Sequence, residues 1–149
     1  MPHFTLQIGP QGPLLDAFAS VSEPRRVALQ ASKLPVPNTV QIRALVDTGA
    51  SGTCIDPSIL SSLGLTPTGS VRVNTPSTGG IPYTAAQYDI AVIVPSANPS
   101  HPALMLPSVP VIASELLQLQ GFHALIGRDV LSRCVLHYNG TMRLFTLAY

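Results

Sequence analysis

The chain has 149 residues, of which 46% are hydrophobic and 10% are charged, with a mean hydropathy of +0.34 and a formal net charge of +1. This length predicts one domain, residues 1–149, and the balanced charge with scattered basic residues argues against nucleic-acid binding. No apolar run approaches the roughly 18 residues of a membrane span, and residues 1–6 lack the pattern of a signal peptide, so we expect a cytoplasmic protein that has no membrane contact.

The first part of the chain predicts strands. Apolar and polar residues alternate from Phe4 to Ile8 before the turn-forming segment 9–13, as in a strand with one buried face. Segments 26–31 and 40–46 flank a stretch with two prolines, which cannot continue a central strand. We therefore expect segments 26–31 and 40–46 to form a hairpin.

A single carboxylate stands at the end of the second of these strands. The apolar residues 44–46 lead directly to Asp47. Four small residues follow it: Thr48, Gly49, Ala50 and Ser51. Glycine lets the chain turn, and the lack of bulky neighbours leaves the carboxylate open to a ligand and to backbone N–H donors. Asp47 is the candidate catalytic residue.

A helix and a second hairpin are predicted next. Asp56 and Pro57 combine an N-cap acceptor with a proline in the first turn, and Gly64 predicts the helix end. Segments 71–73 and 88–94 have the alternation of two hairpin arms.

The tip between these arms is rich in glycine. Four of its residues are candidates for contacting a bound peptide: Thr78, Gly79, Gly80 and Ile81. Glycine permits backbone conformations that a mobile tip requires, and its backbone groups can bond an extended peptide as an added strand. The plain alternative is an ordinary hairpin turn.

The remaining segments are shorter. Residues 95–110 contain five prolines and predict a surface excursion. Residues 114–120 predict a short helix ended by Gly121, and another helix is expected from Arg128 toward residue 133. Beyond it, the dipeptide at 139–140 predicts a type I′ hairpin turn.

The cysteines and histidines show no pattern of a metal site. Cys54 and Cys134 are too few for a disulfide framework, and we expect two buried free thiols. The four histidines have no metal-ligand spacing, so we expect no metal and no other cofactor. Of these histidines, only His123 lies near a motif.

Three segments in this order resemble the retropepsin family, the single-lobed aspartic proteases. They are Leu-Val-Asp-Thr-Gly-Ala at 45–50, the glycine-rich tip with the strand that returns from it at 77–90, and Ala-Leu-Ile-Gly-Arg-Asp-Val-Leu at 124–131. The resemblance covers residues 40–131. It implies an all-β fold: a closed or partly open acid-protease β-barrel with a flap hairpin and one or two short helices.

The resemblance also implies an activity and a partner. Its chemistry needs two facing carboxylates, and this chain has one Asp-Thr-Gly, so we expect a C2 homodimer with Asp47 of each copy on the axis. The expected activity is that of an aspartic endopeptidase on peptide or protein substrates. By resemblance, Thr48 and Gly49 support the carboxylate, and the chain termini interleave across the dimer as strands. The alternative is that each terminus pairs within its own subunit.

By the same resemblance, Ala50 and Ser51 line the cleft floor, and Gly127, Arg128 and Asp129 are structural or dimer-forming residues. Viral members often have an aspartate where Ser51 stands, and it pairs with the arginine at position 128. Without it, Arg128 needs another partner: Asp129, Asp56 or a backbone carbonyl. Asp129 itself resembles a helix N-cap more than a second catalytic acid.

Two other functions stay open. A dimer of this kind can act as a peptide-binding or assembly module with little or no turnover, and the Pro-rich segment and Ser51 leave room for it. A third hypothesis is a protease that cleaves only its own precursor.

Overall fold

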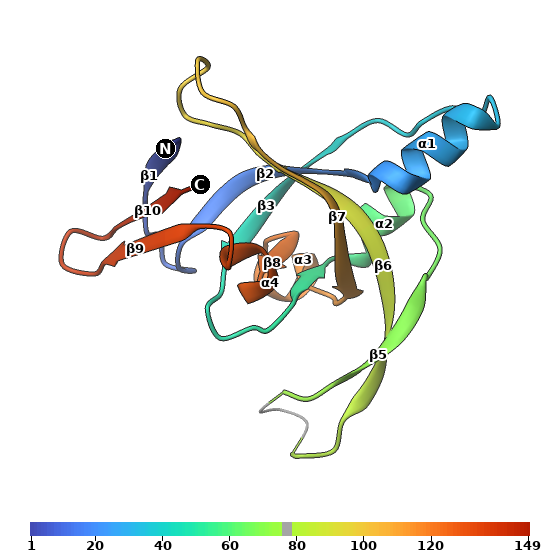
Figure 1. Cartoon of the computed structure of the whole chain (residues 1–149). Helices are drawn as coiled ribbons and strands as arrows, with labels where there is room; N and C mark the ends of the chain where they lie inside the picture. Colours follow the sequence, from blue (N-terminus) through green and yellow to red (C-terminus); the bar gives the residue numbers. More distant parts are fainter. Residues whose placement is uncertain (76–78) are drawn as a thin grey trace.

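The computed structural model describes residues 1–75 and 79–149, and strands dominate it (Figure 1). The described residues form ten strands: β1 His3–Gln7, β2 Leu14–Val21, β3 Val40–Val46, β4 Thr53–Ile55, β5 Gly69–Val73, β6 Tyr83–Val94, β7 Leu104–Ala113, β8 Ala124–Ile126, β9 Val135–Asn139 and β10 Leu144–Ala148. They also form four helices: α1 Glu23–Ala31, α2 Pro57–Ser62, α3 Leu117–Gln120 and α4 Arg128–Leu131. The expected all-β class is confirmed, although helices outnumber the one or two predicted.

Six strands close into a barrel. Their hydrogen-bonded order is β2-β3-β8-β4-β7-β6, and β6 pairs back onto β2 to complete the ring. Alternate side chains fill its interior; on β6, Ile90, Val92 and Val94 are each at most 2% exposed. Strands with period-two patterning produce this arrangement because successive side chains point to opposite faces.

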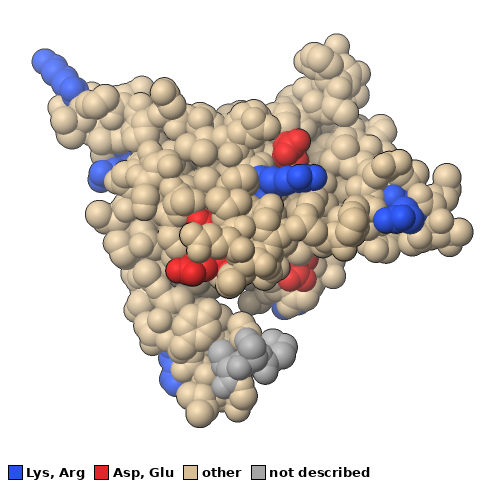
Figure 2. All heavy atoms as spheres, turned by 180° about the vertical axis from the view of Figure 1, so that it is seen from behind, with Lys and Arg blue, Asp and Glu red and all other residues tan. Residues whose placement is uncertain are grey.

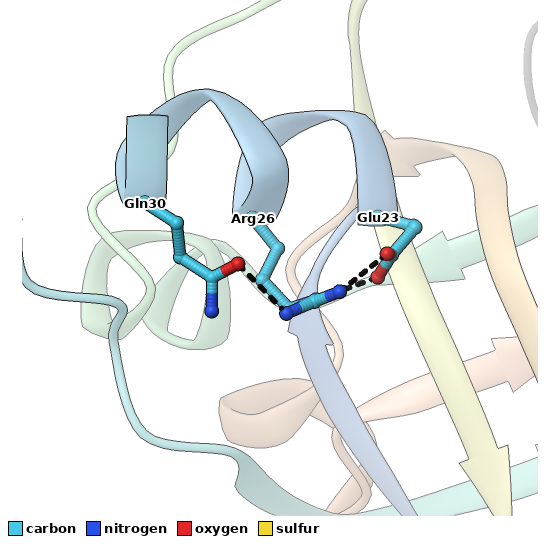
Figure 3. A network of polar contacts seen from close by, with 3 residues as sticks. All are labelled: Glu23, Arg26 and Gln30. Atoms are coloured by element: carbon cyan, nitrogen blue, oxygen red, sulfur yellow. Dashed lines mark hydrogen bonds and ion pairs between the residues drawn. The ribbon is translucent and has the colours of Figure 1, made fainter. Parts of the chain in front are cut away.

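The hairpin partner of β3 differs from the prediction. Segment 26–31 belongs to α1, and β2 is the antiparallel neighbour of β3. Pro24 in the first turn is a helix-start signal. Figure 3 shows side chains of α1 linked along its surface: Arg26 Nε donates to Glu23 Oε2 at 2.6 Å, and Arg26 Nη1 donates to Gln30 Oε1 at 3.0 Å. Spacings of three and four residues bring side chains together only on a helix.

The flap hairpin is confirmed, with a shifted return arm. β5 pairs with the first part of β6, from Val73 opposite Tyr83 to Gly69 opposite Gln87. The segment 88–94, predicted as the return arm, pairs instead with β2 and β7 as part of the barrel wall. In Figure 1 the β5–β6 hairpin extends well beyond the barrel.

The Pro-rich segment is a loop only in its first part. β7 begins at Leu104, so residues 104–110 form a barrel strand that the prolines had argued against. The β6–β7 register is interrupted between Ile90 and Val92, opposite Pro107. A proline is tolerated at such an irregularity because no ladder N–H is needed there.

The two chain ends form a separate sheet with the order β1-β10-β9. β1 pairs with β10 of the same chain, from His3 opposite Ala148 to Gln7 opposite Leu144, which is the second of the two alternatives for the termini. The β9–β10 connection is also longer than the predicted two-residue turn. Asn139 pairs with Leu144, and the positive φ of 53° falls on Arg143 rather than on glycine.

The surface carries few charges. On the face shown in Figure 2, basic and acidic groups are scattered over a mainly uncharged surface, consistent with a chain that is 10% charged. Among the described residues, no helix combines the length and apolar character needed to cross a bilayer.

Candidate active site

Asp47 lies where two neighbouring parallel strands end. β3 and β8 run parallel with Val46 opposite Ile126, and the Asp47 N–H donates to the Ile126 carbonyl at 3.0 Å. Asp47 is therefore the first residue beyond β3, and Gly127 is its counterpart beyond β8. The two motifs identified in the sequence, about eighty residues apart, meet at this edge.

One oxygen of the Asp47 carboxylate is held by its own loop. The Gly49 N–H donates to Asp47 Oδ1 at 2.7 Å. A Cβ at position 49 would lie 3.0 Å from that same oxygen, so any side chain there would crowd the carboxylate. Within the described part of the chain, Asp47 Oδ2 has no hydrogen-bond partner and stays available for chemistry.

Arg128 holds the loop that follows Asp47. Its Nη1 donates to the carbonyls of Thr48 at 3.0 Å and Gly49 at 3.4 Å, and its backbone N–H donates to Ala50 at 3.0 Å. Of the three partners considered for Arg128, the structure shows backbone carbonyls. Backbone carbonyls thus bind Arg128 in the way that the resemblance leads one to expect of an aspartate at position 51. The residue at that position is Ser51, which is exposed.

Gly127 makes the close approach of the two segments possible. A Cβ on Gly127 would lie 2.5 Å from the Gly52 oxygen and 2.6 Å from its carbonyl carbon. The φ of Gly127 is −90°, which any residue adopts. Position 127 therefore needs glycine because a Cβ would not fit against the backbone of the Asp47 loop. The backbone conformation at this position does not require glycine.

Asp129 and Thr53 form a partly buried contact that the sequence did not predict. The Asp129 carboxylate accepts from the Thr53 N–H at 3.0 Å and from Thr53 Oγ1 at 2.8 Å. Thr53 Oγ1 in turn accepts from the Gly127 N–H at 3.2 Å, and Thr53 is 2% exposed. The N-cap of α4 is Gly127 and carries no side-chain capping bond, so the expected N-cap role of Asp129 is wrong. Its role in this structure is to hold the base of the loop.

Cys54, next to Thr53, is a free thiol. Burial raises the pKa of Cys54, and the negative charges of Asp129 and Asp47 raise it further. A thiol with a raised pKa stays protonated at neutral pH, which disfavours a cysteine nucleophile. The carboxylate of Asp47 therefore stays the candidate reactive group at this edge.

The flap residues stand apart from this loop. Gly79 and Gly80 have positive φ values of 59° and 84°, which only glycine adopts without strain, and Ile81 is 77% exposed. Thr78, predicted with them, lies outside the described residues. Within those residues, no hydrogen bond joins the tip to Asp47 or its loop.

His123, the histidine that lies near a motif, makes a hydrogen bond to a strand. His123 Nδ1 accepts from the Arg43 N–H at 3.0 Å, which joins it to β3. A search of the described residues finds no group of three or more histidine, cysteine or acidic side chains arranged to hold a metal ion.

Comparison with known proteins identifies a family and a similar fold. A sequence model of the aspartyl protease family matches residues 36–130, whereas no curated protein sequence matches the chain. A retropepsin-like aspartic protease from Rickettsia conorii is similar in structure, with a TM-score of 0.60 and 17% identity over 99% of this chain and 90% of that chain. The protease of simian foamy virus (mac) aligns over 62% of this chain and 81% of its own, with 17% identity and a TM-score of 0.40.

The match to the family model covers most of the chain and includes both segments that meet at the strand ends. The structural similarity, at 17% identity, concerns the fold. Together with the single Asp-Thr-Gly loop and the six-stranded barrel, these findings show that the chain belongs to the aspartyl protease family and has a retropepsin-like fold.

Proposed function

We propose that the protein is an aspartic endopeptidase that acts as a C2 homodimer, with residues 1–149 forming one half of the enzyme. The observation that carries this proposal is the Asp47 carboxylate. The Gly49 N–H fixes one of its oxygens, and the other has no partner among the residues that the structure describes. The nearby Asp129 is engaged by Thr53 and Val130. A second catalytic carboxylate therefore comes from Asp47 of a second copy.

The proposed chemistry follows from bringing two carboxylates together. Two like charges about 3 Å apart cannot both ionise, so the pair shares one proton and titrates as a unit. The ionised member takes a proton from a water held between them as the water oxygen bonds to the peptide carbonyl carbon, while the protonated member gives its proton to the carbonyl oxygen. In the second step the newly protonated carboxylate gives its proton to the peptide nitrogen and the other carboxylate takes one back from the tetrahedral intermediate, so that the C–N bond breaks and the amine leaves. No covalent enzyme intermediate forms.

The neighbouring residues support this step in the proposal. The Thr48 hydroxyl reaches the partner subunit beneath the dyad, and Gly49 orients Asp47. Ala50 and Ser51 line the floor of the cleft, and Gly127, Arg128 and Asp129 hold the loop in place. The flap residues Thr78, Gly79, Gly80 and Ile81 bind an extended peptide through their backbone groups.

Cleavage of a denatured protein mixture, followed from acidic to neutral pH, tests the assignment. Asp47→Asn removes the charge and the acid of the dyad while keeping the shape, so cleavage should fall to background. Asp89→Asn makes the same chemical change on β6, outside the Asp47 loop, and should keep activity. The wild-type rate should pass through a maximum with pH, because the dyad works only when it holds one proton.

Two results would contradict the proposal. Cleavage that survives Asp47→Asn would refute the catalytic assignment. No cleavage by any variant, with retained binding of an extended peptide, would instead favour a peptide-binding module.

A further inference from the structure

A concave pocket of about 490 Å³ lies away from the Asp47 loop. Three segments line it: the end of β1 with the turn that follows, Arg43 and Leu14 on the paired strands β3 and β2, and the β9–β10 loop with Arg143. Its volume falls in the range of about 300–1,000 Å³ that is typical of ligand sites.

The pocket is basic. Arg43 and Arg143 are its only charged lining residues, although the whole chain has a net charge of only +1. Among the described residues, the Arg43 guanidinium has no hydrogen-bond partner, and Arg143 Nη2 makes one long bond of 3.4 Å to the Ile8 carbonyl. Asp16 is opposite Arg43 in the β2–β3 register, but the two form no ion pair and Asp16 does not line the pocket.

Arg143 has a backbone conformation that is unfavourable for a residue with a side chain. Its φ is 53°, a conformation that costs a residue with a Cβ about 1 kcal/mol or more and that glycine adopts freely. A long cationic side chain therefore occupies a position where glycine would relax the turn. Strain of this kind points to a binding role only where a site lies beside it, and Arg143 lines the pocket.

We infer that this pocket is an exosite for an acidic segment of a protein substrate, an inference that rests on the proposed endopeptidase function. Two guanidinium groups match carboxylates through paired N–H donors. Arg43 lies on β3 four residues before Asp47, about 13 Å along an extended chain, within reach of a substrate held at Asp47.

A binding experiment tests the pocket separately from catalysis. The Asp47→Asn protein, which should not cleave, is titrated into a fluorescein-labelled glutamate-rich peptide and into its glutamine counterpart, and anisotropy is measured. The glutamate peptide should bind more tightly. Arg43→Gln and Arg143→Gly should each weaken it about tenfold, the loss expected for a charge-assisted contact, and added salt should weaken it further. Asp16→Asn, which removes the nearest competing charge in the register, should strengthen it.

The chain offers a matched control. Lys33 is the other described residue with a Cβ and a positive φ, 56°, and it lies at the end of α1. Lys33→Gly removes one positive charge and relaxes one strained residue, as Arg143→Gly does, and should leave peptide binding unchanged. Both glycine variants should unfold at or above the wild-type temperature, so a loss of binding in Arg143→Gly is not a loss of folding.

The kinetic arm uses active enzyme and substrates with or without a glutamate-rich extension. The arginine variants should raise KM for the extended substrate only, with kcat unchanged. Equal binding by the Asp47→Asn protein with and without each arginine substitution would overturn the inference, as would competition by inorganic phosphate without preference for the glutamate peptide. Arginine-dependent binding by a protein that cleaves nothing would retain the pocket and refute the endopeptidase proposal instead.

Discussion

Asp56 joins two helices through one buried carboxylate. Its Oδ1 accepts from the Ser58 N–H at 3.0 Å and from Ser58 Oγ at 2.6 Å, which is the N-cap of α2 that the sequence predicts. Its Oδ2 accepts from the N–H groups of Leu116 at 3.0 Å and Leu117 at 2.8 Å, at the start of α3. Burial opposes ionisation of Asp56, but these hydrogen bonds outweigh it and lower its pKa to about 2.

Asp56→Asn should therefore destabilise the fold in a pH-dependent way. The folded pKa of about 2 lies below the ordinary value of 3.8, so the stabilisation by Asp56 is complete above about pH 4 and is lost as the pH falls through about 2. We expect a loss of about 1 to 2 kcal/mol at neutral pH and a smaller difference near pH 2. Urea unfolding at several pH values measures both, and a pH-independent difference would contradict this account.

Gly127 and Gly52 provide a matched pair of substitutions at one contact. Gly127→Ala would place a methyl group 2.5 Å from the Gly52 oxygen and should destabilise the fold by about 3 kcal/mol, because backbone cannot yield as a side chain does. Gly52→Ala meets nothing within 4 Å and should be nearly neutral. Thermal unfolding of the two variants tests this prediction. Equal stability would show that the two loops can move apart without a cost in free energy.

At the scale of elements, the start of α4 holds the Asp47 loop in place through Arg128. Arg128→Met keeps most of the apolar stem but removes the donors to Thr48 and Gly49. We expect a loss of about 1 kcal/mol in stability, faster amide exchange in residues 48–51 and a lower kcat. Arg25→Met on the exposed surface of α1 is the control and should change none of these quantities.

Elements that depend on local patterns were predictable, and others were not. The start of α2 at Pro57 and the left-handed Gly121 after α3 follow the sequence rules for helix ends. Segment 26–31 is helical, and not the predicted strand, because residues 22–24 start a helix there. β7 is a strand where the prolines predict a loop, because a barrel strand can place Pro107 at an irregularity of its ladder, which composition alone does not reveal.

At the scale of the whole molecule, the proposed dimer predicts how activity depends on concentration. Specific activity should fall on dilution as dimers dissociate, and sedimentation velocity should show the same transition. Adding excess Asp47→Asn protein to wild type should inhibit it, since mixed dimers have one carboxylate. A monomer that retains full activity at every dilution would exclude a shared dyad.

Thr48 separates dimer formation from the fold. Thr48→Val keeps the shape but removes the hydroxyl proposed to reach the partner subunit, so it should shift the dilution transition to higher concentration. Thr48→Ser keeps the hydroxyl and should cause a modest loss. Because Thr48 is exposed in the single chain, neither change should greatly alter monomer unfolding.

The sequence by itself determined the all-β class, the placement of Asp47 after an apolar strand and the match of two motifs to one family, because each of these depends on residues close together in the chain. Only the tertiary structure decided that Arg128 binds the carbonyl of Thr48, that Asp129 holds Thr53, and that Arg43 and Arg143 face one pocket. The residues of these three pairs lie 80, 76 and 100 positions apart in the chain. No local pattern encodes them, since they arise when the barrel and the terminal sheet bring distant segments side by side.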